Sequence, residues 1–174
     1  LGQLAGGIVK NAAKSAVKEA DGSGLDARVV GKVEVAEHGG RKAACLAGDG
    51  YLEVAQGPLL DLEGSLTLEA WIAPEAHGPE GARIIDKSAA GTSNGYLLDT
   101  YPGNSLRLIT RPGSLVHDAK LPPGRWCHVA ATIDSRSGAR TLYLNGSAVS
   151  SSGGPAEEPA AAITRAYALQ RWVT

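Results

Sequence analysis

The sequence has no methionine, no phenylalanine and no long uncharged run of apolar residues. A helix that spans a bilayer needs such a run, so we expect no membrane-spanning segment. No signal peptide is visible either, and the compartment therefore cannot be read directly from the sequence. Because the chain does not begin with methionine, we expect it to be a fragment, a processed product or an excised segment.

An excess of positive charge is also missing. The chain has 17 Lys and Arg against 18 Asp and Glu, which gives a formal net charge of -1. Binding to nucleic acid or to an acidic membrane surface requires a basic excess or a basic patch. The nearest approach to a patch is Lys10, Lys14 and Lys18, whose spacing is typical of the solvated face of a helix. We therefore expect no nucleic-acid partner.

Cysteine is scarce as well. The two cysteines, Cys45 and Cys127, form no C-x-x-C pair and no cluster with histidine at the spacing of a metal site. This usage predicts two free thiols. A disulfide between Cys45 and Cys127 is the alternative that the sequence leaves open.

With 174 residues, the chain is long enough for one domain with its own core and accessory segments. Apolar residues at helical spacing predict a helical segment and linker over residues 1–24. Residues 25–150 are predicted to form a β-sandwich. Residues 151–174 begin with a Ser-, Gly- and Pro-rich linker, and their last part again has helical spacing.

Residues 66–72 show the strongest strand pattern. Leu66, Leu68, Ala70 and Ile72 share one face of a strand by the period of two, and Thr67, Glu69 and Trp71 share the other. Similar short runs follow at regular spacing, separated by Gly, Pro and Asn, and Asn145-Gly146 predicts a tight hairpin. This pattern predicts an all-β, antiparallel sandwich with short helical segments at both ends.

An ordered series of motifs carries a family resemblance. The series is ACLAGDGYLEV, LTLEAWIAP, IIDK, GYLLDT, SLRLI, GRWCHVAATID and LYLNG, over about residues 25–149. In this order the motifs resemble the laminin G-like domains of the concanavalin A-like lectin/glucanase superfamily. The resemblance implies a jelly-roll sandwich of two antiparallel sheets.

The resemblance also implies a use. Such modules are commonly attached to secreted bacterial glycoside hydrolases, where they bind carbohydrate or pack against a neighbouring domain. We therefore expect a polysaccharide or glycan ligand, an adjacent catalytic domain, and an extracellular or periplasmic location. TRAYALQRW near the C-terminus resembles the start of a helix in such a catalytic domain. The alternatives are a protein–protein adhesion module and a fragment of a hydrolase whose catalytic residues lie outside this chain.

The catalytic motif of the superfamily is absent. Its glucanases use a Glu-x-Asp-x-x-Glu strand, in which two carboxylates serve as nucleophile and general acid. Glu69 lies on a comparable strand, but Trp71 stands where a second carboxylate would be needed. We therefore expect this chain to have no catalytic residues, although the parent protein could be a hydrolase.

Sugar binding needs an aromatic face for the C–H side of a pyranose and polar side chains for its hydroxyls. In residues 126–133, alternation directs Cys127 toward the core and Trp126 and His128 outward. If this strand neighbours residues 66–72, both tryptophans, His128 and Glu69 share one outer face. The alternative is that loops or a neighbouring domain cover this face. The candidate carbohydrate-binding residues are Trp71, Glu69, Trp126, His128, Tyr96 and Arg107.

Calcium is the one cofactor that the sequence leaves open. Related jelly rolls often hold a structural calcium ion with loop carboxylates and backbone carbonyls. Asp49, Asp21 and Asp26 are the candidate ligands. The alternative is that these aspartates form hydrogen bonds within their own turns.

Overall fold

The computed structural model of the chain describes residues 16–17, 26–38, 40–62, 64–75, 78–88, 95–110 and 113–153. Within these residues the chain forms strands and one short 3-10 helix, η1, at Pro58–Leu60. No helix in the described part of the chain has the length and apolar character needed to cross a membrane.

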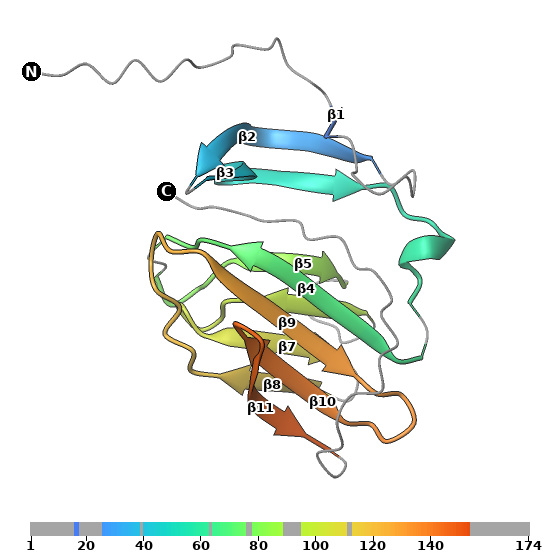
Figure 1. Ribbon diagram of the computed structural model, residues 1–174. Coiled ribbons are helices and arrows are strands. Elements are labelled where there is room, and N and C mark those ends of the chain that lie inside the picture. The colour runs from blue at the N-terminus through green and yellow to red at the C-terminus, as the bar shows by residue number, and fades with distance from the viewer. Residues whose placement is uncertain are drawn as a thin grey trace, which may run out of the picture.

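The strands form three antiparallel sheets. Their bounds are β1 (Ala16–Val17), β2 (Ala27–His38), β3 (Arg41–Val54), β4 (Leu66–Ile72), β5 (Arg83–Lys87), β6 (Tyr96–Asp99), β7 (Leu106–Thr110), β8 (Gly113–His117), β9 (Cys127–Ile133), β10 (Arg140–Leu144) and β11 (Ser147–Ser152). The sheet orders are β1-β2-β3, β11-β10-β9-β4 and β5-β6-β7-β8. Figure 1 shows the two four-stranded sheets as stacked layers. The architecture agrees with the predicted jelly-roll sandwich.

The prediction of a helix in the N-terminal segment is wrong at Ala16–Val17. These two residues form β1 and pair with Arg28 and Ala27 of β2. The pairing outweighs helix propensity, which is a weak preference that tertiary context often overrides. The remaining residues of this segment before Asp26, and the predicted helix over residues 160–174, lie outside the described residues.

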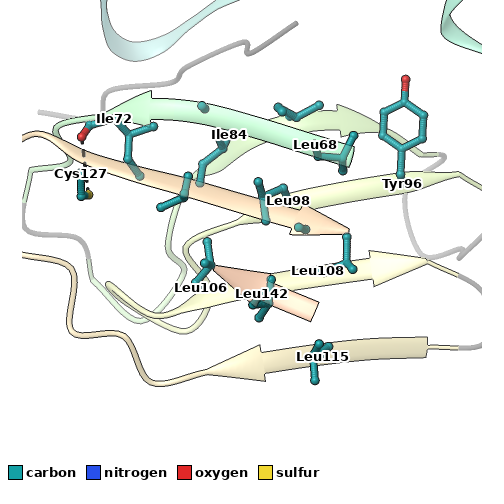
Figure 2. Close-up of a cluster of buried hydrophobic side chains, with 14 of the residues drawn as sticks. Leu68, Ile72, Ile84, Tyr96, Leu98, Leu106, Leu108, Leu115, Cys127 and Leu142 are labelled. Atoms are coloured by element: carbon teal, nitrogen blue, oxygen red, sulfur yellow. Dashed lines mark hydrogen bonds between the residues drawn. The ribbon is translucent and has the colours of Figure 1, made fainter. Parts of the chain in front are cut away.

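The main core lies between the two four-stranded sheets. Leu68 of β4, Leu98 of β6 and Leu108 of β7 are fully buried there, and Figure 2 shows their side chains between the layers. On β4 the burial alternates as the sequence predicts, because every second side chain points into the core. This alternation leaves Glu69 and Trp71 on the outer face.

The two sheets are joined by hydrogen bonds along one side of the sandwich. The Ser150 hydroxyl of β11 donates to the carbonyl of Val116 on β8 at 3.5 Å. The Arg140 guanidinium of β10 donates to the carbonyl of Gly113 at 2.8 Å. These bonds anchor β10 and β11 to the second layer and hold the outer face of their sheet in place.

The hairpin of β2 and β3 has a small apolar cluster of its own. Leu46, Leu52 and Ala27 are buried in it, and Val29, Val33, Ala44 and Val54 pack against them. Figure 1 places the hairpin above the sandwich in that view. This cluster is distinct from the main core, so the apolar side chains of the hairpin pack against one another.

The turn between β10 and β11 has the predicted geometry. Asn145 and Gly146 have φ angles of 51° and 81°, the left-handed conformation that a tight two-residue hairpin requires. The Asn145 side-chain oxygen accepts a hydrogen bond from the backbone N–H of His128 at 2.9 Å. The turn therefore also fixes the start of β9.

Both cysteines are free thiols, as the sequence predicts. Cys127 lies in the core as expected, and its thiol donates to the carbonyl of Ile72 at 3.5 Å, drawn as a dashed line in Figure 2. Burial disfavours the thiolate and raises the pKa of Cys127 to about 11. Burial also raises the pKa of Cys45, with a further contribution from the negative charge of Glu34.

The raised pKa of Cys127 predicts a loss of stability in alkali. Above pH 9 the thiol ionises in the unfolded chain but stays protonated in the fold until the pH approaches about 11. Each pH unit in this window lowers the contribution of Cys127 to the free energy of unfolding by at most about 1.4 kcal/mol. The check is urea denaturation of the wild type and Cys127→Ala between pH 8 and 11. If the free energy of unfolding falls equally with pH in the wild type and in Cys127→Ala, the raised pKa of Cys127 is contradicted.

Candidate functional site

The outer face of the β11-β10-β9-β4 sheet brings together three of the six predicted residues, Trp71, Glu69 and His128. Strands β4 and β9 are direct neighbours, and their register pairs Trp71 with His128 and Glu69 with Ala130. The sequence predicted the outward orientation of each of these residues. It placed them on one face only if β4 and β9 are neighbours. The pairing fulfils that condition.

Trp71 and His128 are in ring contact. Their ring centroids lie 5.3 Å apart, and the planes are tilted by 54°. Trp71 is 47% exposed, although large aromatic side chains are usually buried. His128 thus supports the indole, while about half of the Trp71 surface stays in contact with solvent. A stacking platform for a ligand requires this combination.

Glu69 stands beside the same histidine. Its carboxylate Oε2 lies 3.5 Å from Nε2 of His128, and its side chain is 56% exposed. The pair is an ion pair when the imidazole is protonated. Because both groups are partly solvated, the pair adds little to stability, and both can also bond to a ligand.

The backbone of His128 is held by the hairpin turn of the neighbouring strand pair. Its N–H donates to the side chain of Asn145, and its carbonyl accepts from the Asn145 N–H at 2.8 Å. These two bonds fix the start of β9. The imidazole is therefore presented from rigid backbone.

Trp126 lies directly before β9, which begins at Cys127, and it is half-buried. Alternation along a strand does not extend to a residue outside the strand. Its membership of the outer face therefore stays a prediction.

Tyr96 lies elsewhere. It is the first residue of β6 in the second sheet, and its side chain belongs to the main core. Its hydroxyl donates to the carbonyl of Leu60 at 3.2 Å. Burial, and then the negative charge of Asp61, raise the pKa of this phenol. The structure thus separates Tyr96 from Trp71 by placing them in different sheets.

Arg107 also belongs to the second sheet. Its Nε and Nη2 donate to the two carboxylate oxygens of Asp99 at 3.0 and 2.5 Å. The guanidinium carbon lies 4.0 Å from the centroid of the Tyr101 ring. Asp99 is buried, so Arg107 neutralises and hydrogen-bonds a buried carboxylate.

The calcium hypothesis stays a prediction. Asp26 lies next to β2, Asp49 is described through the backbone of β3, and Asp21 lies outside the described residues. In the part of the chain that the structure describes, no three or more His, Cys, Asp or Glu residues gather in a way that could hold a metal ion.

The outward positions of this sheet differ from those of a two-carboxylate hydrolytic site. Hydrolysis by a carboxylate pair requires a second acid opposite the first. In β4, β9 and β10, which the structure describes in full, the outward positions carry one carboxylate, that of Glu69. An exposed indole, an imidazole and a carboxylate suit recognition of a ligand with both apolar and hydroxyl surfaces.

One aromatic residue of this face was not among the candidates. Tyr143 of β10 pairs with Ala130 and lies between Leu142 and Leu144, which pack on the core. The signal was present in the alternation of the LYLNG motif, in which the two leucines leave the tyrosine on the opposite face.

Comparison with known proteins adds one match. A laminin G family model, described as the concanavalin A-like lectin/glucanases superfamily, matches residues 46–169. None of the curated proteins matches the chain.

Proposed function

The chain belongs to the concanavalin A-like lectin/glucanase superfamily, and on this basis we propose that it is a non-catalytic carbohydrate-binding module. The ligand is a glycan that stacks on Trp71. The observation that carries the proposal is the exposed indole ring of Trp71, supported by His128 and placed beside Glu69 on one sheet face.

The chemistry of a sugar fits these three residues. The C–H face of a pyranose is apolar enough to pack on an indole, and its equatorial hydroxyls need acceptors and donors at the rim. The carboxylate of Glu69 accepts hydrogen bonds from hydroxyl groups. The imidazole of His128 both donates and accepts when it is neutral.

The wider role follows from the family resemblance of the motifs. We infer that the module serves a secreted glycan-degrading protein, outside the cell or in the periplasm, and that a catalytic domain lies next to it. Its task is then to hold the substrate polysaccharide near that domain. The local concentration of substrate rises because binding by the module makes the encounter with the catalytic domain intramolecular.

Affinity electrophoresis in gels that contain plant or bacterial polysaccharides tests the proposal. We expect at least one polysaccharide to retard the protein. Trp71→Ala is expected to weaken this retardation about tenfold, because a lost aromatic stack corresponds to roughly 1.4 kcal/mol. Tyr101→Ala is the matched control, since Tyr101 is an exposed aromatic residue in the turn that follows β6 of the other sheet.

The melting temperature separates a binding effect from a folding effect. We expect Trp71→Ala to melt close to the wild type, because Trp71 is 47% exposed and lies outside the core. If a folded protein is retarded by no polysaccharide, the proposal is contradicted and a domain-packing or adhesion role is favoured instead.

A further inference from the structure

The turn between β10 and β11 contains one of the two Asn-Gly pairs of the sequence, Asn145-Gly146. An asparagine that precedes glycine can lose its side-chain amide without an enzyme. The backbone nitrogen of the glycine attacks Cγ of the asparagine, a C–N bond forms, and ammonia leaves. The product is a succinimide ring, which water opens to aspartate or isoaspartate. Glycine favours the attack because it has no side chain to hinder its nitrogen.

Burial does not shield this pair. Asn145 and Gly146 are both exposed. A methyl group on Gly146 would meet no atom within 4 Å apart from its chain neighbours. Water and hydroxide from the solvent therefore reach both residues, and resistance to deamidation has to come from their conformation.

The conformation of Asn145 keeps the two reacting atoms apart. Ring closure requires the Gly146 nitrogen to rotate to the side of the Asn145 Cα–C bond that carries Cβ. Asn145 has a φ angle of 51°, which lies in the left-handed region. In this region ψ is also positive, and a positive ψ of this size places the nitrogen on the opposite side of the bond from Cβ. The attack therefore requires Asn145 to leave its conformation in the turn.

Two hydrogen bonds to β9 hold Asn145 in this conformation. Its N–H donates to the carbonyl of His128 at 2.8 Å, and its Oδ1 accepts from the N–H of His128 at 2.9 Å. The second bond turns the side-chain carbonyl toward β9, whereas Gly146 leads the chain toward β11, on the other side of β10. The turn must therefore open before the ring can close.

We propose that Asn145 is a site of spontaneous deamidation that the fold keeps closed and that reacts only when the β10–β11 turn opens. The native rate is then the rate in the unfolded chain multiplied by the fraction of time that the turn is open. The change is lasting, because the ammonia is lost to the solvent. Isoaspartate also lengthens the main chain by one carbon, which the tight turn does not accommodate, so the anchor of His128 is lost with it.

Deamidation of the full chain in native buffer and in concentrated urea tests the proposal. Asn145 and Asn94, the asparagine of the other Asn-Gly pair, fall on separate tryptic peptides, so mass spectrometry follows each of them. In urea, Asn94 is the internal reference for an unprotected pair. We expect Asn145 to react more slowly in native buffer than in urea by a factor of about ten or more, because two hydrogen bonds oppose the opening. Equal rates at Asn145 in the two conditions would overturn the proposal.

Two substitutions of His128 isolate the bond to Oδ1 of Asn145. His128→Pro removes the backbone N–H that donates to Asn145. His128→Ala is the matched control, since it removes the imidazole and keeps the N–H. We expect Asn145 to deamidate about tenfold faster in folded His128→Pro than in His128→Ala under native conditions. Equal native rates in these two variants, each shown by circular dichroism to be folded, would contradict the proposed protection.

Hydrogen exchange supplies a second measurement that needs no variant. The backbone amide of Asn145 exchanges when its bond to His128 is broken. We expect its protection factor to agree within about threefold with the ratio of the Asn145 deamidation rates in urea and in native buffer, because one opening exposes both groups. A disagreement of more than about tenfold would overturn the proposal, since deamidation would then not follow the opening of the turn.

Discussion

Replacing Leu98 with alanine is expected to lower the free energy of unfolding by about 3 kcal/mol, within the 2–5 kcal/mol usual for such truncations. Leu98 is fully buried at the centre of β6. The truncation removes buried methyl groups and leaves a cavity between two sheets that cannot close freely. Urea denaturation followed by circular dichroism measures the change.

Leu59→Ala is the matched control for this substitution. Leu59 lies in η1 and is 61% exposed, so the same truncation there is expected to change stability by no more than about 0.5 kcal/mol. Similar losses for Leu98→Ala and Leu59→Ala would contradict the position of the core between the two four-stranded sheets.

Removing the Arg107 side chain is expected to cost about 3 kcal/mol, because it leaves the buried carboxylate of Asp99 without its charged partner. The stacking of the guanidinium on the Tyr101 ring is lost in the same variant. Thermal and urea denaturation of Arg107→Ala measure the effect. A loss below about 1 kcal/mol would contradict a structural role for this pair.

A second variant separates the lost charge pair from lost packing. Asp99→Asn in the Arg107→Ala background removes the buried charge, so we expect it to recover part of the stability.

Glycan binding by Arg107→Ala adds an independent measurement. If Arg107 were a ligand contact, as its polar character suggested, Arg107→Ala would weaken binding under conditions in which the variant is folded. We expect wild-type retardation instead, since Trp71 lies in the other sheet.

These expectations assign different tasks to the two sheets. The β5-β6-β7-β8 sheet carries a charged pair that satisfies a buried carboxylate. The β11-β10-β9-β4 sheet carries an exposed tryptophan whose position is set by register and by the hairpin turn. Stability is therefore expected to respond most to substitutions at Leu98 and Arg107, and binding to substitution of Trp71.

Much of the site geometry was predictable within single strands. The two-residue period of LTLEAWI separates Leu68 from Glu69 and Trp71, and the same period in CHVAATI separates Cys127 from His128. The direction in which the Tyr96 side chain points was not predictable in this way. Its strand, YLLD, is buried along its whole length and shows no alternation that could distinguish its faces.

The sequence by itself determined the class of fold, the inward and outward faces of β4 and β9, and the tight turn at Asn145-Gly146. Each of these depends on residues that are close together along the chain. Only the tertiary structure decided that β4 lies beside β9, so that Trp71 meets His128, and that Asp99 is the partner of Arg107. Strand neighbours and register depend on the packing of segments far apart in sequence, and the period within one strand carries no information about its partner.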